Sequence, residues 1–430
     1  MSHGGALFKV SFIDTISSIL SERHLVPGRG TWKRDASKVP VIAEPLFKAT
    51  SATRRKKRPK GIIRPLSLQQ LCLNSLLTLL RSQITLLTQQ CHSHRNNHSA
   101  PSVPEQRDTN RRDEPCNDIE TTLHQCPLSG IATNASSSTI LTASNNNYII
   151  PPRCSFFRGD LLGIGGSRSY DCAGGELSHP LCQLHGPGFP FVVVDPPWPS
   201  KSVARRKNYR TFGTRRSRDQ TNKTSSRKRK FSGNQKDTPP SSNGEWEKLF
   251  DLPIANVLRP GGLLVVWVTN NPAVKRFVVN KLLPSWQCTV VGTWWWLKLT
   301  SNGQLVVPPP RHAGCRAPYE PFVIAQRKSL TKTISRPCII PAHNIVCSVR
   351  TFHSEKPDLE PHFRRWLPHT VSPSSDFRAL EVFARRLREG WCSAGDEVLK
   401  FQHVDYFQCM KQPPQTSSQK DPYKQLRSGS

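Results

Sequence analysis

Four consecutive residues, Asp195-Pro196-Pro197-Trp198, place an acid, two rigid prolines and an aromatic ring directly after an apolar run. The run, residues 191–194, is short and rich in valine, which predicts a strand buried on both faces. Open α/β sheets bind their ligands at the carboxyl ends of such strands. An acid that merely caps a turn is the alternative interpretation, which the valines and the tryptophan disfavour. We therefore predict a catalytic site at this strand end.

The groups of this motif suit the exocyclic amine of a planar base such as adenine. Proline fixes φ and removes a backbone donor, so the carbonyl oxygens of Pro196 and Pro197 are rigid acceptors. A carboxylate and a carbonyl that accept both hydrogens of the amine favour positive charge on its nitrogen, while Trp198 stacks on the base. Methyl transfer from a sulfonium needs positioning rather than a protein nucleophile. We predict Asp195, Pro196, Pro197 and Trp198 as the catalytic residues.

Short apolar segments rich in β-branched residues recur from Tyr148 onward, at intervals long enough for helices. This alternation predicts an α/β domain over residues 148–410 that positions the motif. Continuous rather than alternating apolarity is typical of strands covered by helices on both sides. The predicted strands are residues 191–194, 263–268, 290–299, 321–325, 345–349, 379–383 and 397–401. For the tandem Trp294-Trp295-Trp296 we expect core packing of at least two rings rather than a stacking platform, because alternate strand residues face opposite sides.

The rest of the chain is predicted to pack poorly, because only 36% of its 430 residues are hydrophobic. A linker of small polar residues, for example, buries too little apolar surface to offset the entropy lost on ordering. The predicted regions are a poorly defined segment with a basic cluster over 1–65, a leucine-rich helix over 66–90, a polar linker over 91–147, a basic insert over 204–244 and a disordered tail over 411–430.

The charge balance indicates a polyanionic partner. Lysine and arginine number 61 against 30 acidic residues, and the net charge of +31 favours nucleic acid or an anionic membrane surface. Residues 66–87 form the longest apolar stretch, but polar residues such as Asn74 and Arg81 interrupt it, so we expect no membrane span. The basic cluster 54–60 is typical of a signal for a nuclear import receptor or of a phosphate-binding arm. We expect a nuclear protein that acts on nucleic acid as a monomer.

The thirteen cysteines lack the paired CxxC spacing of zinc sites, and the chain begins without a secretory leader. We therefore expect reduced thiols. His312 and Cys315 resemble half of a zinc site, but no second pair follows them. We expect no metal.

Further stretches between residues 149 and 408 resemble the adenine-N6 methyltransferases with an Asp-Pro-Pro-Trp motif, in particular their branch called methyltransferase-like protein four. The resemblance implies a Rossmann-like, S-adenosylmethionine-dependent fold of the α/β class with a permuted motif order, in which the catalytic motif precedes part of the cofactor site. The residues that carry it, besides the motif itself, are 149–152, 201–203, 267–270, 284–286, 318–320, 353–354, 356–357 and 397–407.

The same resemblance implies a set of residues that bind S-adenosylmethionine. Lys356 would lie near the carboxylate of the cofactor, Glu381 would accept from its ribose hydroxyls, and Arg385 would hold the ribose and carboxylate edge. The remaining candidates for cofactor binding are Asp160 near the adenine, Asp396 and Glu397 near the adenine or ribose, and Asp195 of the motif.

Residues 201–209 follow the motif and are expected to form a gate over the target base. Lys201, Arg205 and Arg206 would reach phosphates, and Asn208 or Tyr209 would contact a base that has been flipped out. The chain departs from the family pattern twice. Asp396 stands where an asparagine is expected, which puts its cofactor contact in doubt, and the basic insert after Tyr209 is longer than expected.

The resemblance implies an adenine in RNA or DNA as the acceptor. We expect RNA, with 2′-O-methyladenosine of U2 small nuclear RNA as the specific substrate that the resemblance to this branch implies. An unpaired base enters a pocket more cheaply than a base in a duplex. Adenine in DNA remains an alternative. A non-catalytic nucleic-acid-binding partner is a second, supported by Asp396 alone. Methylation of a protein amide and a scaffold role fit less well, because the motif begins with an acid at a strand end.

Overall fold

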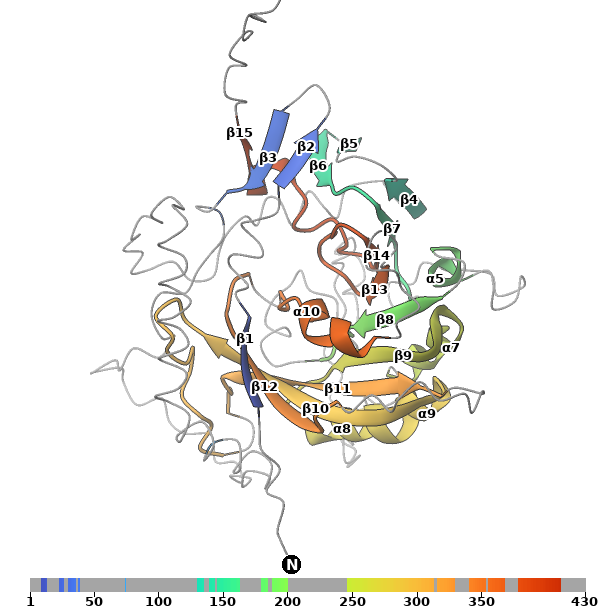
Figure 1. The fold of residues 1–430 in the computed structure, drawn as a ribbon, viewed down its shortest axis with the longest axis vertical. Coiled ribbons are helices and arrows are strands. Elements are labelled where there is room, and N and C mark those ends of the chain that lie inside the picture. Colours follow the sequence, from blue (N-terminus) through green and yellow to red (C-terminus); the bar gives the residue numbers. More distant parts are fainter. Residues whose placement is uncertain are drawn as a thin grey trace, which may run out of the picture.

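The computed structural model of the chain describes residues 9–13, 23–26, 30–35, 38, 74, 130–134, 139–143, 145–162, 179–184, 188–199, 246–312, 315–328, 340–352, 355–367 and 378–410. Most of the described residues between 148 and 410 belong to one large sheet and the helices that cover it (Figure 1). The predicted leucine-rich helix, apart from Asn74, lies outside the described residues. So do the basic cluster 54–60, the insert 204–244 and the tail 411–430.

The large sheet is made of β1 (Lys9–Ile13), β4 (Gly130–Asn134), β7 (Cys154–Arg158), β8 (Phe189–Val194), β9 (Leu258–Trp267), β10 (Cys288–Leu299), β11 (Tyr319–Arg327), β12 (His343–Val349), β13 (Ala379–Val382) and β14 (Trp391–Ala394). Their order is β1-β12-β10-β11-β9-β8-β13-β14-β7-β4. Neighbours run parallel, except that β11 is antiparallel to β10 and β9, and β4 is antiparallel to β7. This mostly parallel sheet is a Rossmann-like α/β fold, as the sequence predicted.

Helical segments cover both faces of the sheet. They are α5 (Pro180–Gln183), η4 (Glu247–Asp251), α7 (Ile254–Val257), α8 (Pro272–Phe277), η5 (Val278–Leu282), α9 (Leu283–Ser285), α10 (Glu360–Phe363), η6 (Arg364–Trp366) and η7 (Val404–Tyr406). Strand β8 shows the layering, because Val192 and Val194 pack in the core that contains α5, α7 and α8, whereas Phe191 and Val193 pack in the core that contains α10. Figure 1 shows α10 apart from the group of α7, α8 and α9.

Six of the seven predicted strands are confirmed, each within or beside an observed strand of the large sheet. The seventh, residues 397–401, is wrong, because this segment forms turns after Gly395. The amide of Val398 donates to the carbonyl of Gly395, and the amide of Lys400 donates to that of Glu397. Val398 and Leu399 are fully buried. An apolar turn that packs into a core therefore produced the strand-like pattern.

Strands before residue 148 correct two further expectations. Strand β1 extends the large sheet beside β12, and β4 forms its other edge. Two smaller sheets contain β2 (Arg23–Val26), β3 (Gly30–Arg34), β5 (Thr139–Ala143), β6 (Asn146–Ile150) and β15 (Phe407–Met410). The segment 1–65 thus contributes strands to the domain, and the predicted linker 91–147 contains β4, β5 and the start of β6. These strands are short and lack long apolar runs, and β1 and β3 pair with strands far away in the sequence, so composition gave no signal for them.

The three consecutive tryptophans of β10 belong to the core, as predicted. Their exposed fractions are 1%, 3% and 2% for Trp294, Trp295 and Trp296. Trp294 and Trp296 pack on the same face of the sheet as Phe363 of α10, whereas Trp295 packs in a different cluster on the other side. A strand that buries large side chains on both faces occupies the interior of a sheet, and β10 lies between β12 and β11.

The bulge in β10 at Gly292 gives a test of this packing. A Cβ atom on Gly292 would lie 2.8 Å from the carbonyl oxygen of Ala342, which already accepts from the amide of Thr293. Because the Ala342 carbonyl cannot move aside without weakening this hydrogen bond, Gly292→Ala should lower the free energy of unfolding by about 1–3 kcal/mol. Thr289→Ala, on an exposed position of the same strand, should change it by less than about 0.5 kcal/mol. Urea unfolding of both variants measures the difference, and equal stabilities would contradict the register of β10 beside Ala342.

Candidate functional site

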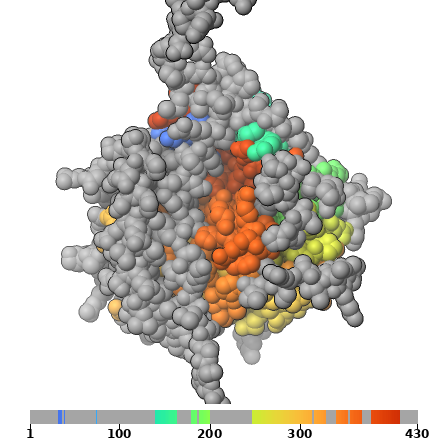
Figure 2. All heavy atoms as spheres, viewed as in Figure 1, coloured from blue at the N-terminus to red at the C-terminus, as the bar shows by residue number. Residues whose placement is uncertain are grey.

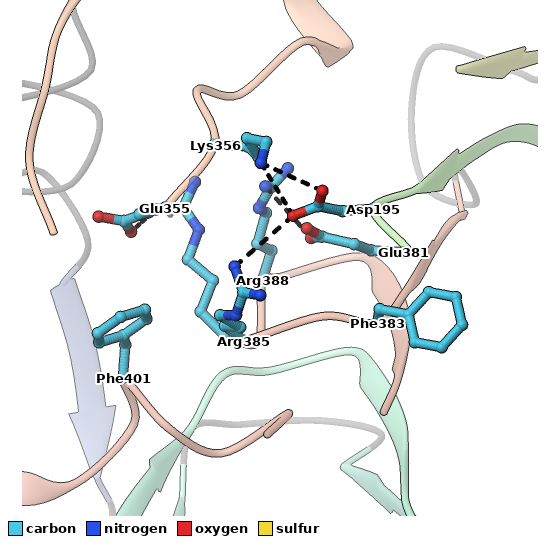
Figure 3. Close-up of a pocket in the computed structure, with 9 residues that line it drawn as sticks. Asp195, Glu355, Lys356, Glu381, Phe383, Arg385, Arg388 and Phe401 are labelled. Carbon is cyan, nitrogen blue, oxygen red and sulfur yellow. Dashed lines mark hydrogen bonds and ion pairs between the residues drawn. The ribbon is translucent and has the colours of Figure 1, made fainter. Parts of the chain in front are cut away.

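A pocket lies at the carboxyl ends of the central parallel strands (Figure 3). Asp195 follows β8, and Glu381 lies in the adjacent strand β13. Other lining residues follow β12, β13 and β14. The complete lining is Asp195, Glu355, Lys356, Glu381, Phe383, Arg385, Arg386, Arg388 and Phe401. Figure 2 shows the C-terminal segments that supply most of these residues, in orange and red, gathered at the centre of one face.

The parallel pairing of β8 and β13 brings the motif and the later cofactor candidates together. Val194 pairs with Val382, and the amide of Asp195 donates to the carbonyl of Val382 at 3.2 Å. Phe383 then takes a φ of 63°, a left-handed conformation that turns the chain sharply after β13. The segment 383–388 consequently runs across the end of β8 rather than away from it. This is the arrangement in which open α/β sheets bind ligands.

A buried ion-pair network surrounds the motif acid. The ammonium group of Lys356 lies 3.1 Å from both carboxylate oxygens of Asp195 and 3.2 Å from a carboxylate oxygen of Glu320. Glu320 lies near the start of β11, and its other oxygen accepts from Lys298 of β10 at 2.6 Å. The Lys356 side chain is 8% exposed and also lies 5.1 Å from the centre of the Trp267 ring. The carboxylates of Asp195 and Glu320 therefore balance the ammonium groups of Lys356 and Lys298 along one side of the pocket.

This network fixes the charge of its members. Burial alone would lower the pKa of Lys356, but the carboxylates of Asp195 and Glu320 outweigh it and raise the pKa. Burial alone would raise the pKa of Glu320, but Lys298 and Lys356 outweigh it and lower the pKa to about 2. Lys356 therefore remains a cation at neutral pH and cannot accept a proton, and Glu320 remains an anion.

Arginines form the other side of the pocket. Arg385 lies 3.6 Å from a carboxylate oxygen of Asp195 and donates to Glu397 at 2.9 Å. Arg388 lies 3.2 Å from Glu381. Arg386 is 4% exposed and donates to Glu355 at 3.3 Å. The lining thus alternates acids with cations, which suits a ligand that carries both a carboxylate and hydroxyl or ammonium groups.

The space between these side chains is small for a cofactor. It amounts to about 270 Å³ even with open solvent included, so the enclosed part is smaller still. The arginine and lysine side chains fill the remainder with their internal ion pairs. A ligand that enters must therefore exchange some of these ion pairs for its own groups.

The structure brings together some of the predicted site residues and separates others. Asp195, Lys356, Glu381 and Arg385 line the pocket, and Glu397 reaches it through Arg385. Besides Glu397, two further predicted cofactor residues lie outside the lining. Asp160 accepts from the amide of Leu162, and Asp396 is exposed and uses its backbone carbonyl to accept from Arg158. The predicted substrate residues lie outside the described residues, namely Lys201, Arg205, Arg206, Asn208 and Tyr209.

The stacking role predicted for Trp198 is wrong for this structure. Its side chain is 6% exposed and packs edge to face against Trp246 and Phe277, at centroid distances of 5.7 and 6.5 Å. The indole nitrogen donates to the carbonyl of Trp267 at 2.8 Å. The carbonyl of Pro196 likewise accepts from the amide of Trp198. Trp198 therefore anchors the motif to the core and to the end of β9, and neither ring face is open to a base.

Several lining residues escaped sequence reasoning. Glu355 immediately precedes Lys356, and Arg386 and Arg388 lie one and three positions after Arg385, so proximity to predicted residues was an available signal. Phe401 belonged to the stretch 397–407 of the family resemblance, but the sequence did not show that the turns after β14 carry it back to the pocket. Glu320 belonged to a stretch of the family resemblance, but its ion pair with Lys356 joins residues on different strands.

The described parts of the chain hold neither a group of metal ligands nor a helix that could cross a membrane. There, no three side chains of His, Cys, Asp or Glu gather closely enough to hold a metal ion. The sulfur of Cys315 lies 3.3 Å from the ring nitrogens of His312, which is a local contact between neighbours. Among the helices of the described residues, none is sufficiently long and apolar to cross a membrane.

Comparisons with known proteins agree with the position of the pocket. Residues 189–397 match the family model MT-A70, a range that includes every lining residue except Phe401. Human N(6)-adenine-specific methyltransferase METTL4 is 30% identical over 296 residues, which are 67% of this chain and 51% of the human protein. The chain spans about half the length of this relative and of its mouse counterpart.

Two more distant relatives differ in the nucleic acid that their names specify. The N6-methyladenosine RNA methyltransferase MTA1 of Pyricularia oryzae is 29% identical over 282 residues, 65% of this chain and 60% of the fungal protein. The DNA N6-methyl methyltransferase of Caenorhabditis elegans is 24% identical over 269 residues, 62% of this chain and 57% of the nematode protein.

The anchoring of Trp198 predicts a stability effect. Trp198→Ala should lower the free energy of unfolding by about 3–5 kcal/mol, because it removes a buried ring. Trp198→Phe keeps most of the packing but loses the hydrogen bond to the Trp267 carbonyl, and should cost about 1–3 kcal/mol. Trp246→Ala, which removes the neighbouring ring outside the motif, is the matched control and should resemble Trp198→Ala. Denaturant unfolding decides, and a Trp198→Ala protein as stable as the unchanged one would restore the stacking role.

The low pKa of Glu320 predicts a pH effect. A carboxyl whose pKa is about 2 when folded and near its ordinary value when unfolded stabilises the fold above pH 4.5, and loses that contribution as the pH falls toward 2. The contribution is on the order of 2–3 kcal/mol. Glu320→Gln should therefore flatten the loss of unfolding free energy between pH 5 and 2, whereas Glu247→Gln, at an exposed acid, should not. Urea titrations across this range measure the slopes, and identical slopes for Glu320→Gln and the unchanged protein would disprove the network.

Proposed function

We propose that the chain is a member of the MT-A70 family, whose model matches residues 189–397, and that it transfers a methyl group from S-adenosylmethionine to the N6 amine of adenine in nucleic acid. One observation carries the proposal. Asp195, the acid of the Asp-Pro-Pro-Trp motif, faces a pocket at the ends of β8 and β13, where Glu381 and three arginines converge. The acid can hold the acceptor amine and the polar cluster can hold the cofactor. Both open into one pocket, as transfer of a methyl group between the two molecules requires.

The pocket residues fit S-adenosylmethionine, the methyl donor of MT-A70 methyltransferases. Glu381 is 8% exposed, and one of its carboxylate oxygens makes an ion-pair contact with Arg388 but no hydrogen bond. A ribose hydroxyl would satisfy that oxygen. Lys356 and Arg385 supply cations for the carboxylate of the donor. When bound, the donor supplies an electrophilic methyl group on a sulfonium.

The side chains of this protein orient the acceptor rather than react with it. Asp195 accepts hydrogen bonds from the N6 amine and stabilises the positive charge that develops on the amine nitrogen. Lys356 and Arg385 hold that carboxylate from two sides, so its position is set before the substrate arrives. Because Lys356 stays protonated, it can only donate hydrogen bonds. Asp195 is therefore the hydrogen-bond acceptor for the N–H groups of the substrate amine. The anchored Trp198 and the prolines keep the motif rigid.

We propose RNA as the acceptor, and 2′-O-methyladenosine in U2 small nuclear RNA as the specific substrate. The resemblance to the methyltransferase-like four branch supports this choice, as does the cost of unstacking a base from a duplex, about a few kcal/mol. The net charge of +31 supports binding to a nucleic-acid backbone but does not choose between RNA and DNA. We further propose that the protein acts as a monomer in the nucleus, where the cluster 54–60 would engage an import receptor.

DNA adenine is the second candidate acceptor, favoured by the name of the Caenorhabditis elegans relative. A non-catalytic role had Asp396 as its only support. Because the Asp396 side chain is exposed and lies outside the pocket lining, its difference from the family pattern leaves the network of Asp195 and Lys356 unaltered. Catalysis therefore remains the better interpretation.

Mass spectrometry of nucleosides tests the proposal. The full chain is incubated with labelled S-adenosylmethionine and with RNA, single-stranded DNA or duplex DNA that carries one target adenine, at a stated salt concentration because phosphate contacts dominate binding. We expect N6-methyladenosine, with the highest kcat/KM on RNA. Asp195→Asn should lower kcat by about a hundredfold or more while donor binding stays measurable, because it removes the charge beside the amine.

Each outcome of this experiment addresses a different part of the proposal. A preference for duplex DNA would overturn the choice of RNA and leave the chemistry intact. Full turnover by Asp195→Asn would overturn the role of Asp195. Donor binding without methylation of any adenine substrate would favour the non-catalytic alternative.

A further inference from the structure

Gln402 joins the arginine side of the pocket to another part of the domain. It is fully buried and directly follows Phe401, which lines the pocket (Figure 3). Its amide nitrogen donates to the carbonyl of Ile149 at 2.6 Å. Its amide oxygen accepts from the backbone amide of Leu387 at 3.3 Å, between Arg386 and Arg388. A buried amide with partners on both ends holds the attached segments in one arrangement.

The same oxygen has a second donor, Arg34, at the end of β3. The guanidinium of Arg34 donates to Gln402 at 3.2 Å and is separated from it by 368 positions in the sequence. Arg34 is 3% exposed, and its guanidinium carbon lies 4.2 Å from the centre of the Phe407 ring. Strand β3 also pairs with β15, and the amide of Asp35 donates to the carbonyl of Tyr406. Figure 1 shows β3 beside β15 in one small sheet.

An arginine at this position calls for a chemical reason. Burial of a charged side chain is costly unless hydrogen bonds compensate it, and an apolar side chain would pack on Phe407 without that penalty. The guanidinium supplies what an apolar side chain lacks, which is a donor to the Gln402 oxygen. With two donors on one oxygen, the amide of Gln402 has a single favourable orientation. That orientation keeps an acceptor in place for Leu387.

We infer that Arg34 is a positioning residue for the methyl-donor pocket. It orients Gln402, which holds the Leu387 amide and thereby the segment that carries Arg385, Arg386 and Arg388. Without the hydrogen bond from Arg34 this segment is less ordered. Binding of S-adenosylmethionine must then supply the free energy that orders it. The inference rests on the proposed function, and it adds to the pocket a strand that lies outside the matched residues 189–397.

Substitution at Arg34 in the full chain tests this inference. Arg34→Met keeps the length and packing of the side chain but removes the donor. Lys33→Met, at the half-buried neighbouring position whose side chain faces the other way along β3, is the matched control. Calorimetry gives the Kd for S-adenosylmethionine, steady-state assays give KM for donor and RNA, and hydrogen exchange followed by NMR gives the protection of the Leu387 amide.

We expect Arg34→Met to raise the Kd and KM for S-adenosylmethionine by about five- to tenfold, the factor that corresponds to the net contribution of one typical hydrogen bond. The KM for RNA, and kcat at saturating donor, should stay unchanged, and the Leu387 amide should exchange faster. Arg34→Lys keeps a cation but loses the planar fork of the guanidinium, so it should give an intermediate Kd. This variant also serves if Arg34→Met does not fold. Lys33→Met should match the unchanged protein in every measurement.

Contrary results separate this inference from the proposed function. Wild-type donor affinity in both Arg34 variants, or unchanged exchange of Leu387, would overturn the role of Arg34. An equal rise in KM for donor and RNA would also overturn it, because that pattern indicates a general structural defect. Absence of donor binding by the unchanged protein would instead contradict the proposed function.

Discussion

The site depends on a lysine that two carboxylates share, one buried and one partly exposed. Lys356 contacts Asp195 and Glu320, and its side chain is only 8% exposed. Two carboxylates this close repel each other, and each would be costly to bury alone. Lys356 between them offsets this repulsion, and Lys298 balances the remaining charge on Glu320. Lys356 thereby holds the carboxylate of Asp195 in a largely buried position at the pocket.

The topology of the sheet makes this sharing possible. Asp195 follows β8 and Lys356 follows β12, two parallel-sheet strands separated by β10, β11 and β9. Because β11 is antiparallel to its neighbours, its first residues, not its last, lie at the edge where β8 ends. Glu320 near that start thus reaches Lys356 across the sheet. Strand β11 therefore places Glu320, near its first residue, at this edge of the sheet. A parallel strand would have placed its last residues there instead.

The sequence predicted the parts of this site that local pattern determines. Continuous apolar runs identified the buried strands, and residue type and strand position identified Asp195. Lys356, Glu381 and Arg385 came from family resemblance. The environment of Trp198 was not predictable, because a motif shows which ring is present but not whether Trp246 and Phe277 enclose it. The N-terminal strands escaped for a similar reason, since β3 pairs with β15 and Arg34 bonds a residue 368 positions away.

The wide separation of the site residues in the chain has a consequence for folding. Asp195 and Lys356 are 161 positions apart, and their contact requires closure of a long loop and parallel pairing between distant strands. Contacts of high sequence separation form late and slowly, because the entropy of loop closure must be lost before the contact contributes. A nascent chain that has emerged only as far as β12 still lacks β13, so it exposes the apolar edge of β8 and an unpaired Asp195. During synthesis the acid of the Asp-Pro-Pro-Trp motif therefore acquires its neighbours among the last events, and the half-made domain is the form most exposed to aggregation.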